Sequence, residues 1–177
     1  MNKKGISTLV IAVIVVIVVV VVGVGVYLAM SGTGGNGGPT PTPTPAPSVE
    51  GATSLQFSVE VTSEGTSWGT NTYMAKNIGA SSMMIRIEME STEGDMVYIL
   101  NGAEQKAWAY MAGEWTDISS TFSTEWDSWH TMVSGYQTRL ADWTGTGEYT
   151  YTEEGTTVRI FGISVNPTLA DSLFQPT

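Results

Sequence analysis

The side chains that usually perform nucleophilic catalysis are nearly absent from this sequence. The chain has one histidine and no cysteine, and it contains no Gly-x-Ser-x-Gly or phosphate-loop pattern. These absences exclude the usual pairs of a nucleophile and a base. His130 follows Trp129 on a predicted helix, and we interpret it as a solvated residue at the edge of the apolar face. We therefore expect a protein that is not an enzyme and that uses no cofactor.

Acidic side chains are the second group that could do chemistry. The densest groups are Glu88, Glu90, Glu93 and Asp95, and the pair Glu153 and Glu154. Neither group has the spacing of a calcium-binding loop, so we interpret them as a solvated acidic face and expect no metal site. A carboxylate pair for glycoside hydrolysis stays open, because no feature of the sequence selects one particular pair.

The acidic residues also decide which partners the chain can have. All 17 Asp and Glu lie at Glu50 or later, where there are five Lys and Arg, so this part carries a formal charge of −12. Nucleic-acid binding depends on clustered Lys and Arg that neutralise phosphates. We therefore expect no nucleic-acid partner.

Apolar and polarisable side chains are what the sequence supplies in excess. Seven methionines and all six tryptophans lie after residue 48. Methionine suits surfaces that accommodate varied apolar ligands, although a plain core role is the alternative. The predicted lining of an apolar cavity comprises Met83, Ile85, Ile87, Met89, Trp108 and Tyr110 on strands, with Trp126, Trp129, Val133 and Tyr136 on a helix. We expect this cavity to hold a lipid or another apolar molecule.

Strands must position the first group of these residues. Leu55, Phe57, Val59 and Val61 alternate with polar residues, which is the two-residue period of a strand with one solvated face. The same period recurs at residues 83–90. Further strands are predicted at 66–76, 96–100, 104–111, 115–118, 148–152 and 156–165, with a hairpin turn at Asn101–Gly102.

A helix must position the second group. An apolar stripe with alternating spacings of four and three residues comprises Phe122, Trp126, Trp129, Val133, Tyr136, Leu140 and Trp143. Only a helix places these side chains on one face. Ser119, Ser120 and Thr121 offer oxygens for an N-cap, and Gly145 and Gly147 are expected to end the helix. If this helix covers a cavity, it should be held less tightly than the sheet.

The order of these elements resembles the periplasmic lipoprotein carriers of the LolA and LolB type. Residues 98–102, 106–110 and 113–118 are similar to a hairpin of that family, and residues 163–174 are similar to its closing strand and short final segment. The resemblance implies a mainly β (α+β) domain, in which an antiparallel half-barrel sheet carries one long amphipathic helix on its concave face. It also implies a cavity for lipid chains.

The N-terminal residues predict a membrane anchor. Residues 6–30 carry no charge and are long enough for a transmembrane helix, since about 20 residues span a bilayer of about 30 Å. Lys3 and Lys4 place the N-terminus in the cytoplasm. Residues 31–48 are rich in Gly and then in Pro and Thr, which predicts a stalk. Residues 49–177 then form one extracytoplasmic domain on a single-pass protein of the cell membrane; a cleaved secretory signal is the alternative.

The first residues also resemble the class III signals of archaeal pilins and archaellins. The resemblance rests on the basic pair Lys3-Lys4 and on Gly5, after which such signals are cleaved. It implies that the apolar helix survives and packs into a filament. Two functions follow as expectations: a membrane-anchored binding module for a lipid, lipoprotein or other apolar ligand, or a structural surface protein or pilin-like subunit without a ligand.

Overall fold

The computed structural model describes residues 48–90 and 94–177. The predicted membrane anchor at residues 6–30, the class III signal and nearly all of the predicted stalk lie outside the described residues. Within the described ranges, no helix combines the length and the hydropathy that crossing a bilayer requires.

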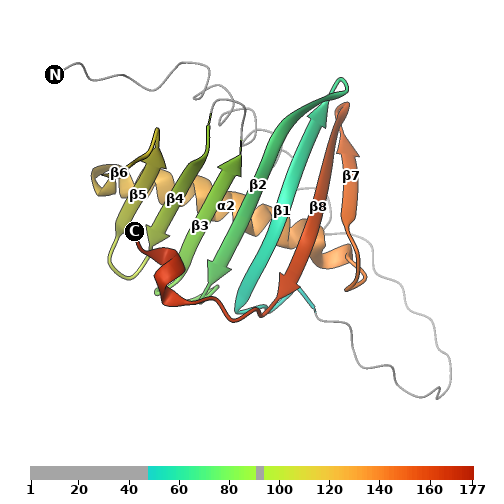
Figure 1. Cartoon of the computed structure of the whole chain (residues 1–177). Helices are drawn as coiled ribbons and strands as arrows, with labels where there is room; N and C mark the ends of the chain where they lie inside the picture. Colours follow the sequence, from blue (N-terminus) through green and yellow to red (C-terminus); the bar gives the residue numbers. More distant parts are fainter. Residues whose placement is uncertain (1–47, 91–93) are drawn as a thin grey trace, which may run out of the picture.

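Eight antiparallel strands form one open sheet in the order β6-β5-β4-β3-β2-β1-β8-β7 (Figure 1). Their bounds are β1 Ser54–Ser63, β2 Thr66–Lys76, β3 Met84–Glu90, β4 Met96–Asn101, β5 Lys106–Met111, β6 Glu114–Asp117, β7 Tyr149–Glu153 and β8 Thr156–Val165. Each predicted strand is confirmed to within two residues at either end. The mainly β class is therefore confirmed, and β8 joins the meander by pairing with β1.

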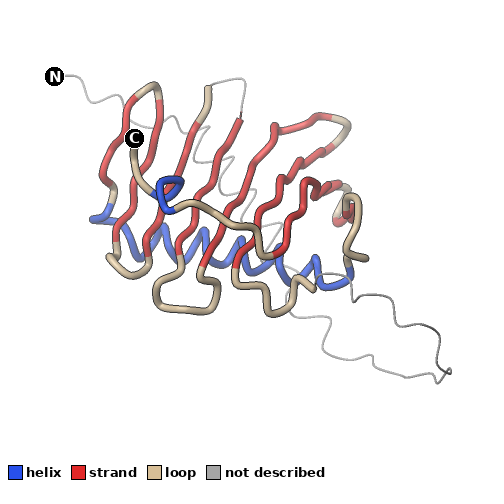
Figure 2. The backbone as a smooth tube through the Cα atoms, turned by 60° about the horizontal axis from the view of Figure 1, so that its bottom comes forward, coloured by secondary structure: helices blue, strands red, loops and turns tan. Residues whose placement is uncertain are grey.

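One α-helix crosses the strands on a single face of the sheet, which we call the inner face (Figure 2). This helix, α2, spans Phe122–Arg139 between the 3₁₀ turns η1 (Ser119–Thr121) and η2 (Leu140–Asp142). The predicted helix included Trp143, whereas the helical turns end with η2 at Asp142 and Trp143 is extended. The indole N–H of Trp143 donates to Thr146 O and Gly147 O at 3.1 and 3.2 Å.

The predicted hydroxyl cap of α2 is wrong. Thr121 holds the N-cap position, but its side chain makes no cap hydrogen bond. The hydroxyl instead donates to the carbonyl oxygen of Ile118 at 2.9 Å, because η1 already turns the chain there. Ser119 supports β5, since its Oγ accepts from Ala107 N at 3.1 Å.

The opposite side of the sheet, the outer face, is crossed by the C-terminal segment. There the 3₁₀ turn η3 (Asp171–Phe174) buries Phe174 against Met74 and Ile99. Lys76 pairs with Asp171, and Arg86 Nη1 donates to Leu173 O at 2.8 Å. This segment therefore covers the apolar part of the outer face over β2, β3 and β4.

The turn between β4 and β5 is longer than the predicted Asn101–Gly102 turn, because β5 begins only at Lys106. Asn101 is buried, and its Oδ1 accepts from Glu104 N at 3.2 Å. Gly102 is needed for space, since a Cβ there would lie 2.9 Å from both the carbonyl oxygen of Met83 and Cη2 of Trp126.

Gly102→Ala is expected to lower the free energy of unfolding by about 1–3 kcal/mol, because the new methyl group overpacks a backbone carbonyl and an indole ring. Urea unfolding would measure the change. Ala103→Ser, at an exposed position of the same turn, should stay within about 0.5 kcal/mol of the wild type. Equal stability of the two variants would mean that Trp126 does not pack against this turn.

Candidate functional site

The structure brings eight of the ten predicted lining residues together. Met83, Ile85, Ile87 and Met89 lie in the core cluster between the inner face and α2, together with Trp126, Trp129, Val133 and Tyr136. Seven of them are no more than 6% exposed, and Trp126 is half-buried. These residues therefore form the interface between the sheet and the helix.

Trp108 and Tyr110 do not join them, and their prediction as inner-face residues is wrong. Tyr98 pairs with Ala109, so the inner positions of β5 are held by alanines and Met111. Trp108 lies in the outer-face cluster with Ile99 and Phe174. The physical reason is the two-residue period: once Ala109 faces the helix, its neighbours on both sides must face away. The small side chains of β5 leave room for the aromatic residues of α2.

Aromatic rings fill the centre of the interface. The ring centroids of Phe57 and Tyr73 are 5.3 Å apart, and Tyr136 lies 5.3 Å from Tyr73 and 5.6 Å from Phe57. Tyr98 lies 5.1 Å from Trp129. At this level the helix and the sheet contact each other directly, so a ligand here would have to displace ring contacts. Tyr73 and Tyr98 were not among the predicted lining residues, because their positions opposite Phe57 and Ile87 follow only from the strand register.

Buried polar groups in this interface stay uncharged. Burial raises the pKa of Tyr73 and of Tyr136 well above its usual value. The hydroxyl of Tyr73 donates to Sδ of Met132 at 3.0 Å. Burial, and then the nearby Glu125, also raise the pKa of Tyr98. The phenols are therefore packing groups rather than acids or bases near neutral pH.

A second level of the inner face lies two residues further along each strand, toward the β1–β2 hairpin. We call it the upper row; it comprises Tyr149, Ile160, Val59, Asn71, Met89, Met96 and Met111, one from each strand from β7 to β5. No member is charged. The row lies about 7 Å from the level of Phe57 and Tyr98, beside the helix rather than beneath it, since a helix has a radius of about 5–6 Å.

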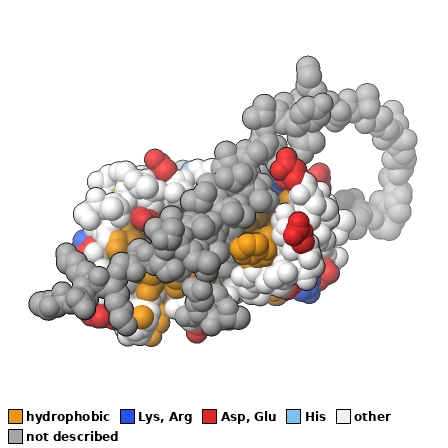
Figure 3. Space-filling view, turned by 90° about the horizontal axis from the view of Figure 1, so that it is seen from above, with side chains coloured by type: hydrophobic (Ala, Val, Ile, Leu, Met, Phe, Trp, Pro, Cys, Tyr) orange, Lys and Arg blue, Asp and Glu red, His pale blue; other side chains and the backbone are white. Residues whose placement is uncertain are grey.

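The upper row is only partly covered. Val59 and Ile160 are fully buried, whereas Asn71, Met96 and Met111 are half-buried. Seen from above, hydrophobic side chains gather along this side of the molecule, and acidic side chains lie around them (Figure 3). The upper row is therefore a part of the inner face where apolar side chains are partly exposed to solvent.

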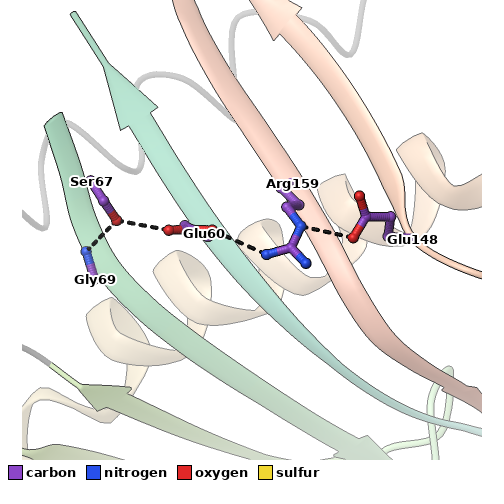
Figure 4. Close-up of polar contacts among 5 residues, drawn as sticks. All are labelled: Glu60, Ser67, Gly69, Glu148 and Arg159. Atoms are coloured by element: carbon purple, nitrogen blue, oxygen red, sulfur yellow. Dashed lines mark hydrogen bonds and ion pairs between the residues drawn. The ribbon is translucent and has the colours of Figure 1, made fainter. Parts of the chain in front are cut away.

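The outer face over β1, β2, β7 and β8 is polar instead (Figure 4). Arg159 donates from Nε to Glu148 at 2.8 Å and from Nη1 to Glu60 at 3.3 Å, and both carboxylates raise its pKa. The other carboxylate oxygen of Glu60 accepts from Ser67 Oγ at 3.0 Å. Glu60 and Glu148 are thus held as partners of a guanidinium that ties the strands together.

Groups that would bind a hard metal ion are not assembled in the part of the chain that the structure describes. No three His, Asp or Glu side chains lie together there in a metal-binding arrangement. His130 is half-buried on α2 and stacks on Trp126 with their ring centroids 5.6 Å apart. Its position is that of a helix-packing residue.

Comparison with protein-family models, with curated proteins and with solved structures gives no match. The resemblances to the lipoprotein carriers and to the class III signals therefore stay predictions.

Proposed function

We propose that this chain is a single-pass membrane protein whose extracytoplasmic domain binds an apolar chain, such as that of a lipid or lipoprotein, along the upper row. The observation that carries the proposal is the continuous uncharged row across seven strands beside α2. Six strand spacings make it about 29 Å long. The hydrocarbon core of a bilayer, about 30 Å thick, holds two opposed lipid chains, so a row of about 29 Å is long enough for one extended chain.

The predicted anchor and stalk support the proposed location. Uncharged residues 6–30 after Lys3 and Lys4 fit a membrane span with a cytoplasmic N-terminus. The Pro/Thr-rich stretch within residues 31–48 would hold the domain away from the bilayer surface. We also propose that the sheet curves as a half-barrel around its ligand, as in the carriers that the sequence resembles.

Photolabelling of the full-length protein tests this function. A lipid with a photoactivatable acyl chain should label Met96, Met111 and Tyr149, and should leave Trp108 on the outer face unlabelled. Met111→Glu should reduce labelling of the domain about tenfold, because the carboxylate would be buried against hydrocarbon. The matched control is Tyr110→Glu, which places the same charge on the other face of the same strand. Labelling confined to residues 6–30 would exclude the proposed site.

One observation favours the alternative, a structural surface protein or pilin-like subunit without a ligand. The aromatic contacts of Phe57, Tyr73 and Tyr136 complete a core between the sheet and the helix without any ligand. A domain of this kind would give no labelling above the level of a denatured control.

A further inference from the structure

The methionines of the domain are divided between the two faces of the sheet. Met74 and Met84 belong to the outer-face cluster. Met89, Met96 and Met111 belong to the inner-face core, at one end of the upper row. Met83, just before β3, and Met132, on α2, lie in the same core, and the inner-face strands themselves supply three thioether groups.

The three inner methionines occupy the same level on neighbouring strands β3, β4 and β5. Met89 is the direct partner of Met96 in the β3–β4 pairing. In the β4–β5 pairing Val97 lies opposite Tyr110, and the next step of this register puts Met96 opposite Met111. Met96 is therefore the central member of a line of three.

Their spacing allows the sulfur atoms to meet. Directly opposed residues on neighbouring strands have Cβ atoms about 4.5–5.5 Å apart. Each methionine has three rotatable side-chain bonds, so the two flanking thioethers can turn toward the central one. Met89 is 6% exposed, while Met96 and Met111 are half-buried, which leaves an approach from the open side of the row.

We propose that Met89, Met96 and Met111 form a binding site for a soft monovalent cation, Cu(I) or its redox-inert analogue Ag(I). Thioether sulfur selects Cu(I) over hard cations, which prefer carboxylate and carbonyl oxygen. The row around the site is uncharged, and the domain's formal charge of −12 raises the local concentration of cations. The site shares the face proposed for a lipid but does not depend on lipid binding.

Titration of the full-length protein in detergent with Ag(I) tests the site. One equivalent should bind, and three of the nine methionine methyl signals should shift in carbon-13 NMR spectra. The Met96→Leu/Met111→Leu double variant should weaken binding at least about tenfold, because it removes two of three ligands while keeping apolar side chains of similar size. The Met74→Leu/Met84→Leu variant on the outer face should bind as the wild type does.

Two further variants exclude other soft ligands. Both His130→Gln and Met30→Leu should leave Ag(I) binding unchanged. Equal Ag(I) binding by the wild type and the Met96→Leu/Met111→Leu variant would overturn the site, as would no binding by the wild type. Ag(I) binding and lipid photolabelling are each measured on the wild type in separate experiments, so the failure of either proposal is seen separately.

Discussion

Replacing Trp129 with alanine is expected to lower the free energy of unfolding by about 3–5 kcal/mol, the usual cost of deleting a large aromatic side chain from a packed core. Trp129 is 3% exposed and its ring lies 5.1 Å from that of Tyr98. Its indole N–H also donates to Glu125 at 3.3 Å. These contacts favour a helix that is packed as part of the core, so α2 should unfold together with the sheet.

Urea unfolding followed by circular dichroism measures this effect, with Trp68→Ala as the matched control. Trp68 is 45% exposed on β2, and its loss should cost less than about 0.5 kcal/mol. A Trp129→Ala loss below about 1 kcal/mol, with helical signal disappearing before the sheet signal, would instead describe a helix that opens independently.

Local periodicity predicted the elements well because each period reflects a single strand or helix. The strands at Ser54–Ser63 and Met84–Glu90 lie where alternation places them. The stripe from Phe122 to Tyr136 faces the sheet because spacings of three and four follow the helical turn. These features need no knowledge of which strands are neighbours.

The site required the long-range register, which a single sequence does not contain. Trp108 has the large apolar side chain expected of a lining residue. In the β4–β5 pairing, however, Ala107 and Ala109 lie opposite inner-face residues of β4, so these alanines face the helix and Trp108 faces away from it. Met96 and Met111 come together only because β4 and β5 pair in one particular alignment. The small size of Ala107 and Ala109 was a signal in the sequence, because small inward-facing side chains leave room for bulky side chains on a helix.

Because of its buried phenols, the domain is expected to have a lower free energy of unfolding in alkaline solution. An unfolded tyrosine has a pKa of about 10. Burial raises the pKa of Tyr73 and Tyr136 well above that value in the folded protein. Above about pH 10 the unfolded chain therefore loses protons that the folded chain keeps, so the free energy of unfolding falls as the pH rises. Below about pH 10 both states keep these protons, and the contribution is fully present.

The free energy of unfolding should fall with a slope that grows from near zero at pH 9 to about 1.4 kcal/mol per pH unit for each buried phenol above about pH 11, or about 2.7 kcal/mol per pH unit for the pair. Urea unfolding between pH 9 and pH 12 would measure this slope. Tyr136→Phe should remove about half of this slope, and the Tyr73→Phe/Tyr136→Phe double variant nearly all of it, because phenylalanine keeps the ring packing but has no proton to lose. A slope would persist from Tyr151, whose pKa burial raises to about 12, and from Tyr98, whose pKa burial also raises. An unchanged slope in the double variant would mean that solvent reaches both hydroxyl groups, and that the centre of the interface between α2 and the sheet is open.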